Sequence, residues 1–129
     1  EGTKIVVGKG PDLNELKQEF PNVVFKGEKT NGDLASYFAS ADVFVMPSLT
    51  DTFGIVIIEG LQCGTPVAAY PVKGPKDILE GTNGGVLNKD LKVAALEALK
   101  LNRDDCKEIA KKYTWENCAK IFLANTAPN

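Results

Sequence analysis

Two carboxylates, Asp51 and Glu59, flank an otherwise apolar segment with seven residues between them. Gly54 lies between the two acids and directly follows Phe53. Carboxylates accept hydrogen bonds from hydroxyl groups, and the backbone N–H groups at the start of a helix bind anions. If a helix begins near Gly54, both kinds of contact occur within a few residues. The chemistry this suggests is recognition of a diphosphate together with a neighbouring group that carries hydroxyls.

Each carboxylate also has a plainer interpretation. Asp51 fits a turn or a helix N-cap. Glu59 fits a solvated helical stripe shared with Gln62. Against that second interpretation, residues 55–58 and Leu61 make the segment apolar nearly all round, and a buried carboxylate needs a polar partner because burial of an unpaired charge is costly. The pattern alone leaves both interpretations of Glu59 open.

The elements that would position these residues are short strands alternating with helices. Segments with helical spacing separate apolar runs that are bounded by glycine or proline, and Pro11 is expected to start one such helix. From Asp90 onward the pattern indicates helices only, the last of them after a Thr114 cap. Strand and helix alternate, so the class is α/β. The runs, typical of parallel strands buried on both faces, are residues 4–8, 22–25, 42–47, 66–70 and 84–87.

Residues 55–58 are all β-branched and favour a strand by propensity alone. Topology favours a helix, because parallel neighbours at 42–47 and 66–70 need a crossover between them. Gly64 then stands where a helix C-cap is wanted. We therefore expect a buried helix that begins near Phe53 or Gly54, at the carboxyl edge of the sheet, where open α/β sheets bind ligands.

Two further glycine loops are predicted at the same edge. In VGKGPDL (residues 7–13), a tight turn before a helix explains the glycines without a ligand, while the position of the loop keeps a ligand role open. In PVKGPKDIL (residues 71–79), a glycine and a proline precede a short helix. Lys73 and Lys76 of that loop could neutralise phosphate, although exposed loop lysines are usually only solvated.

Composition narrows the class of function. The 129 residues, 43% hydrophobic and 25% charged, are expected to form one domain, 1–129, around one core. A net charge of -2 without a basic stripe argues against nucleic acid as a partner. The chain has no histidine, which excludes Ser-His and Cys-His triads within it. Its three cysteines lack C-x-x-C spacing, so neither a disulfide framework nor a zinc site is expected. With no membrane-span-length run and no signal peptide, cytoplasmic residence is the simplest expectation.

Residues 7–11, 23–79 and 113–122 together closely resemble the C-terminal domain of retaining glycosyltransferases of family four, which have the GT-B fold. The most specific part is the ordered set ADVFVMPS, a carboxylate, FG, a second carboxylate and G-x-P-V. The resemblance implies a three-layer αβα Rossmann-like domain with a mostly parallel sheet, lacking the usual first strand and helix. Without that central strand, a gap is expected between the strands at 4–8 and 42–46, closed by their direct pairing or by a neighbouring molecule.

The resemblance also implies a site. Asp51 and Glu59 would be its catalytic carboxylates, with Asp51 facing hydroxyls of the donor sugar and Glu59 facing the ribose. Two positions depart from the family pattern, since Asp51 replaces the usual glutamate and Lys9 stands where an aspartate is usual. The other implied donor-binding residues hold the diphosphate and sugar through their backbone (Phe53, Gly54, Ile55 and Val56), lie near the base (Phe25 and Gly27) or line the cleft (Gly8 and Gly10). Gly74 and Pro75 correspond to a family glycine-proline loop.

The function implied is that of the donor-binding half of a retaining glycosyltransferase. It would move a sugar from a UDP-, GDP- or ADP-linked donor to a glycan or lipid-linked acceptor, with no required metal or other cofactor. Family members carry an N-terminal acceptor domain before this region, so the chain is expected to be a fragment, inactive alone. The sequence leaves open whether the parent enzyme is cytoplasmic throughout or also makes peripheral contact with the inner face of a membrane.

A non-catalytic flavodoxin-like or receiver-like binding module is the alternative, because it shares the parallel sheet. Receivers place an acidic cluster at the ends of strands, around an aspartate that is phosphorylated. Here Asp42 begins its strand instead of ending it, and acids at the predicted carboxyl edge are sparse. Binding of nucleotide sugars separates the two functions.

Overall fold

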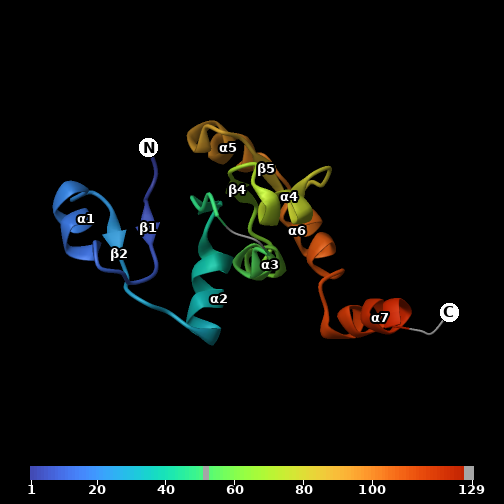
Figure 1. Cartoon of the computed structure of the whole chain (residues 1–129). Coiled ribbons are helices and arrows are strands. Elements are labelled where there is room, and N and C mark those ends of the chain that lie inside the picture. Colours follow the sequence, from blue (N-terminus) through green and yellow to red (C-terminus); the bar gives the residue numbers. More distant parts are fainter. Residues whose placement is uncertain (51–52, 127–129) are drawn as a thin grey trace. The chain divides into compact units, whose positions relative to one another are not determined.

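The computed structural model describes residues 1–50 and 53–126 (Figure 1). The chain divides into two compact units, Glu1–Leu34 (unit 1) and Ala35–Asn129 (unit 2). The assignment of residues 1–129 to one domain stays a prediction. The predicted site residue Asp51 lies outside the described residues.

Unit 1 is one strand-helix-strand motif: β1 (Ile5–Val6), α1 (Leu13–Glu19) and β2 (Val24–Phe25). The two strands are parallel, with Ile5 opposite Val24 and Val6 opposite Phe25. The helix begins two residues later than expected, because Pro11 lies in the preceding turn and Asp12 is the N-cap.

The apolar side chains of unit 1 are exposed or half-buried. Ile5 on β1 is 49% exposed, and Val24 on β2 is 37% exposed. The prediction that the runs at 4–8 and 22–25 are buried on both faces is therefore wrong for these two strands. The physical reason is size, because two two-residue strands and one seven-residue helix cover too little surface to enclose a side chain.

Unit 2 is built on a three-stranded parallel sheet of order β3-β4-β5. This confirms that the runs at 42–47 and 66–70 are parallel neighbours. The strands of the described residues form two separate sheets, so direct pairing of the strands at 4–8 and 42–46 is not observed, and closure of the gap by a neighbouring molecule stays a prediction. The elements are α2 (Asn31–Ser40, which begins in unit 1), β3 (Phe44–Met46), α3 (Ile55–Gln62), β4 (Val67–Ala69), α4 (Lys73–Leu79), β5 (Gly85–Leu87), α5 (Leu91–Ala98), α6 (Arg103–Ala110) and α7 (Trp115–Thr126).

The core of unit 2 lies on both faces of β4, whose residues Val67, Ala68 and Ala69 are fully buried. Val67 and Ala69 belong to the larger cluster, with residues of α3, α4 and α6. Ala68 points to the other face, where it packs with Ala94 and Ala98 of α5. Helices on both faces of the parallel sheet confirm the predicted αβα layers.

The helix boundaries follow local chemistry. Gly64 has a φ of +75°, and the Thr65 N–H reaches the Gly60 carbonyl at 2.9 Å, which closes α3 with a Schellman motif as the glycine predicted. The Thr114 hydroxyl accepts a hydrogen bond from the Asn117 N–H at 3.1 Å, which confirms the predicted cap of α7. None of the described helices is long and apolar enough to span a membrane.

A single arginine ties α6 to the end of α2. The Arg103 guanidinium donates hydrogen bonds of 2.8 Å to the carbonyls of Ala39 and Ala41. Carbonyls in the last turn of a helix lack partners within the helix, so the guanidinium acts as a C-cap for α2. The start of β3, which follows this turn, is thereby fixed to α6.

Candidate functional site

The candidate site lies where the chain leaves β3 and enters α3. Because β3 ends at Met46 and runs parallel to β4, the segment 47–54 starts at the carboxyl end of the sheet. The expected helix start near Phe53 or Gly54 is confirmed, with Gly54 as N-cap. The carboxyl edge is where open α/β sheets bind ligands.

Gly54 adopts a left-handed backbone, with φ +79° and ψ 41°. Residues that carry a Cβ rarely adopt this backbone conformation, so the turn requires glycine. The Gly54 carbonyl accepts hydrogen bonds from the N–H groups of Ile57 (2.9 Å) and Ile58 (3.4 Å). Gly54 is also buried, and a Cβ there would lie 3.1 Å from Ile78 Cδ1. Backbone conformation and packing are thus sufficient reasons for the glycine, before any ligand is considered.

The start of α3 is the positive end of its helix dipole. The first turn of α3 contains no acidic residue. Backbone N–H groups in the first turn of a helix have no acceptor within the helix, and the helix dipole is positive there. The arrangement therefore suits an anion next to Ile55 and Val56.

Only one face of α3 is buried. Ile57, Ile58, Gly60 and Leu61 face the core, as their 3.6-residue periodicity requires. Ile55 is 60% exposed and Val56 is 39% exposed. The prediction of a buried helix is therefore wrong for Ile55 and Val56, because unit 2 covers α3 from one side only.

Glu59 lies on the outer stripe of α3 and is partly buried. It follows Ile55 by four residues and Val56 by three, so these three side chains are neighbours on one face. Its carboxylate forms no hydrogen bond or ion pair with any other residue that the structure describes. The placement agrees with the exposed-stripe interpretation and leaves the carboxylate accessible to a ligand bound at the start of the helix.

Four predicted donor-binding residues come together in unit 1. The Gly8 N–H donates a 2.8 Å hydrogen bond to the Gly27 carbonyl, which joins the loops that follow β1 and β2. Gly8, Gly10 and Phe25 also line an open hollow of about 280 Å³ beside α1. Lys9, in the same loop, forms a 2.5 Å ion pair with Glu28. The predicted residues thus fall into this group in unit 1 and the group from Phe53 to Glu59 in unit 2.

The glycine-proline segment differs from its prediction. Gly74 and Pro75 do not precede α4 but form its first turn, and both are buried. Proline is tolerated there because first-turn N–H groups have no partner in the helix. Lys73 is exposed and pairs with Asp77 at 3.4 Å, which agrees with the solvated interpretation of this loop's lysines.

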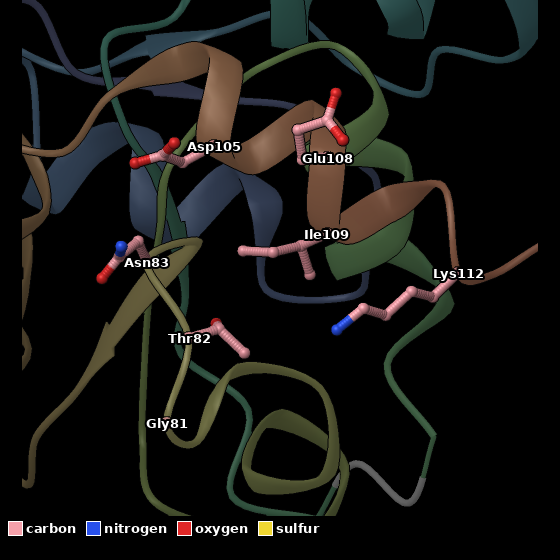
Figure 2. Close-up of a pocket in the computed structure, with 7 residues that line it drawn as sticks. All are labelled: Gly81, Thr82, Asn83, Asp105, Glu108, Ile109 and Lys112. Carbon is pink, nitrogen blue, oxygen red and sulfur yellow. The ribbon is translucent and has the colours of Figure 1, made fainter.

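A hollow of about 290 Å³ lies elsewhere in unit 2 and contains none of the predicted residues. Figure 2 shows Asp105, Glu108 and Lys112 of the α6 region on one side of it and Thr82 and Asn83 on the other. Residues 81–83 precede β5, so the hollow adjoins the amino end of that strand. It therefore lies away from the carboxyl edge that positions the candidate site.

The titratable side chains of the described residues form no metal centre. Among residues 1–50 and 53–126, no group of three or more cysteines and acids is arranged to hold a metal ion. The cysteines are free, and only Cys106 is buried. Burial raises the pKa of the Cys106 thiol, and the nearby Arg103 charge opposes that rise. The thiol therefore serves as a core residue.

Sequence patterns missed the contact between Gly54 and Ile78. Ile78 lies on α4, beyond the next strand, and is 4% exposed. No spacing rule links two residues on different helices, so only the three-dimensional packing identifies the pair. The apolar periodicity of residues 75–79 could have placed Ile78 in the core, but not beneath the Gly54 turn.

The fold is that of a parallel α/β domain with helices on both faces of its sheet, and comparison with known proteins gives its family. The model of the family Glycosyl transferases group 1 matches residues 3–104. The chain belongs to this family. The match confirms the predicted resemblance to the C-terminal domain of a GT-B glycosyltransferase and decides against the receiver-like alternative.

Individual relatives agree with the family match. An uncharacterized glycosyltransferase of Methanocaldococcus jannaschii is 32% identical over 80% of this chain and 32% of its own length. A GDP-mannose-dependent alpha-mannosyltransferase of Mycolicibacterium smegmatis is 37% identical over 64% of this chain and 22% of its own length. The chain thus spans about a third or less of the curated relatives it matches.

Solved structures confirm the Rossmann-like fold. Sucrose-phosphate synthase from Thermosynechococcus elongatus superposes with a TM-score of 0.76 and 27% identity, over 94% of this chain and 37% of the other. Anabaena HepE in complex with UDP-glucose superposes with a TM-score of 0.73 and 24% identity, over 96% of this chain and 40% of the other. At 24% identity, the HepE match is informative about the fold alone.

Proposed function

We propose that this chain is the donor-binding part of a retaining glycosyltransferase, which transfers a sugar from a nucleotide-diphosphate sugar to a glycan or lipid-linked acceptor. The observation that carries the proposal is the start of α3. A glycine turn at the carboxyl edge of a parallel sheet leads into a helix whose first turn holds no acidic residue, and the accessible carboxylate of Glu59 lies one turn further along. In this proposal, the acceptor domain belongs to the remainder of a longer enzyme.

The ligand geometry follows from helix dimensions. The diphosphate binds at the amides of Phe53, Gly54, Ile55 and Val56, where the helix dipole favours negative charge. Glu59 is four residues beyond Ile55, about 6 Å along the axis at roughly 1.5 Å per residue. A ribose attached to the diphosphate brings its two hydroxyls within reach, and a carboxylate accepts both hydrogen bonds. Asp51 is assigned to the hydroxyls of the donor sugar on the other side.

Relatives and structural neighbours support a nucleotide sugar as the ligand. One relative is named as GDP-mannose-dependent, and structural neighbours were solved with UDP or UDP-glucose. The identity of the base, among uracil, guanine and adenine, is what the titration described below determines.

The chain contributes electrostatic stabilisation to the reaction. Bond breaking at the anomeric carbon moves negative charge onto the departing nucleoside diphosphate. A fixed helix start that binds this charge lowers the barrier, because its dipoles are already oriented. No histidine is present to act as a base, so the roles assigned here rest on carboxylates and backbone amides.

Titration calorimetry of the 129-residue chain with UDP, GDP and ADP, each free and as a sugar conjugate, tests the proposal. We expect one nucleotide to bind measurably. Glu59→Ala should weaken that binding by about 10- to 100-fold, because hydrogen bonds to a charged group contribute roughly 1.5–3 kcal/mol.

Glu97→Ala on α5 is the matched control, since Glu97 is an exposed helical glutamate away from the carboxyl edge. It should leave the dissociation constant unchanged. Absence of binding for all six ligands, or an equal effect of the two substitutions, contradicts the proposed function.

A further inference from the structure

The Gly54 turn rests on two isoleucine methyl groups. A Cβ at Gly54 would lie 3.1 Å from Ile78 Cδ1 and 3.2 Å from Ile57 Cδ1. Ile57 is fully buried and belongs to α3 itself, whereas Ile78 is 4% exposed and belongs to α4. The inner side of the turn is therefore closed by a side chain from a different helix.

We propose that Ile78 is a positioning residue for the nucleotide-sugar site. Its Cδ1 methyl fills the space beneath Gly54 and so fixes the turn whose amides bind the donor diphosphate. The inference rests on the proposed function, because the amides of α3 must bind a ligand for their position to matter. It adds a residue of α4 that touches no donor atom in this arrangement.

The Gly54 turn needs a packing partner because glycine has no side chain of its own. A left-handed residue without a side chain has many accessible conformations and cannot hold its own position by packing. Hydrogen bonds from the Ile57 and Ile58 amides fix only the carbonyl side of the turn. The α-carbon side depends on what packs against it, and the side chains nearest to where a Cβ would lie are those of Ile78 and Ile57. A shift of about 1 Å in a binding group is enough to lower function strongly.

Ile78→Val tests the inference by removing only the Cδ1 methyl. We expect the dissociation constant of the best-bound nucleotide among UDP, GDP and ADP to rise about fivefold, which corresponds to about 1 kcal/mol. Hydrogen exchange at the Ile57 and Ile58 amides, measured without ligand, should become faster because their acceptor is less well held.

Ile109→Val is the matched control. Ile109 belongs to the same core cluster, is 9% exposed, and places its Cδ1 against another glycine, 2.9 Å from a Cβ built at Gly84. Gly84 precedes β5 and lies away from the start of α3. This substitution should change neither the dissociation constant nor the exchange of the two amides.

A double-mutant cycle isolates the contact. Gly54→Ala should weaken binding strongly in the parent chain, because the new methyl meets Ile78 Cδ1. In the Ile78→Val background that methyl enters the vacated space, so the same substitution should weaken binding less. The strain of alanine at φ +79° is present in both backgrounds and cancels in the cycle.

The outcomes separate the two proposals. If the unaltered chain binds none of the nucleotides or their sugar conjugates, the proposed function fails and the positioning role falls with it. If the unaltered chain binds and Ile78→Val changes the dissociation constant no more than Ile109→Val does, the positioning role alone is overturned. Faster amide exchange without weaker binding also overturns it, because Ile78 then supports the turn without positioning the ligand.

Discussion

β1 and β4 are both parallel strands of strand-helix units, yet their surroundings differ completely. β4 is fully buried at all three residues, whereas Ile5 and Val6 of β1 are each more than 40% exposed. The difference is the number of layers, since β4 has a neighbouring strand on each side and helices on both faces. A continuous apolar run therefore indicates a strand, but burial depends on the elements that cover it.

The glycines of the two units differ in the same way. In unit 1, a Cβ at Gly8, Gly10 or Gly27 would meet no other atom within 4 Å. In unit 2, Gly54 and Gly85 are tightly enclosed. The loops around these three glycines thus have room for a ligand, but only Gly10 can readily take a side chain, because Gly8 (φ +141°) and Gly27 (φ +71°) have a positive φ. Gly54 and Gly85 are instead enclosed by the core.

The largest expected difference concerns leucines. Leu61→Ala should lower the free energy of unfolding by about 2–5 kcal/mol, because it leaves a cavity in the core. Leu61 is fully buried, whereas Leu16 on α1 is 39% exposed. Leu16→Ala should cost roughly 1 kcal/mol or less on the same scale. Urea unfolding followed by circular dichroism measures both, and equal losses would contradict the contrast between the units.

Glycine substitutions give the next largest effect. A Cβ at Gly85 would lie 2.4 Å from the Val67 carbonyl oxygen, a backbone atom that cannot turn aside. Gly85→Ala should therefore cost about 1–3 kcal/mol through overpacking. Gly10→Ala in unit 1 should change stability by about 0.5 kcal/mol at most. A measurable loss for Gly10→Ala in thermal unfolding would show that the unit 1 loop is more constrained than its open surroundings indicate.

Charged side chains provide a smaller contrast. Arg103→Met removes two hydrogen bonds to carbonyls at the end of α2 and should cost roughly 1–3 kcal/mol, given about 0.5–1.5 kcal/mol for each bond. Lys9→Met removes the exposed pair with Glu28 and should cost between about 0 and 1 kcal/mol. Repeating both unfolding measurements in 1 M salt sharpens the test, because only the Lys9 effect should shrink.

The smallest expected effect is on how the free energy of unfolding changes at alkaline pH. It belongs to unit 2, because residues 1–34 contain neither cysteine nor tyrosine, whose side chains lose a proton at alkaline pH. Burial raises the pKa of Cys106 in the folded chain above its ordinary value of 9.0. The folded state then holds the thiol proton more tightly, so this stabilisation is present below about pH 9 and is lost as pH rises through the raised pKa. Cys106→Ala should flatten the alkaline fall in stability, and an unchanged slope would assign that fall to other groups.

Much of unit 2 could be predicted from sequence because its signals are local or topological. The glycine at position 64 and the hydroxyl at position 114 act within a few residues, so their capping roles are readable from the chain. The helix at 55–62 was predictable despite four β-branched residues, because parallel strands on either side require a crossover. Glu59 could be placed on that helix, although its exposure could not.

What could not be predicted depends on contacts between distant residues. Arg103 bonds to carbonyls 62 and 64 positions earlier, and Ile78 meets Gly54 across a strand. Neither contact leaves a spacing signal. The exposure of Ile55 and of β1 could not be predicted from the sequence pattern either, because an apolar residue type shows only that burial is possible. The side that neighbours cover is decided by the three-dimensional assembly.

The hydrogen bonds between Arg103 and the end of α2 make their two sides unequally tolerant of mutation. Both acceptors are main-chain carbonyls, which every amino acid possesses, so the residues at positions 39 and 41 can be substituted without loss of the bonds. The donor side has no such freedom, since arginine alone supplies a planar fork of N–H groups at that reach. In a library of variants, substitutions at 103 should therefore be depleted, while those at 39 and 41 should be limited only by their own packing.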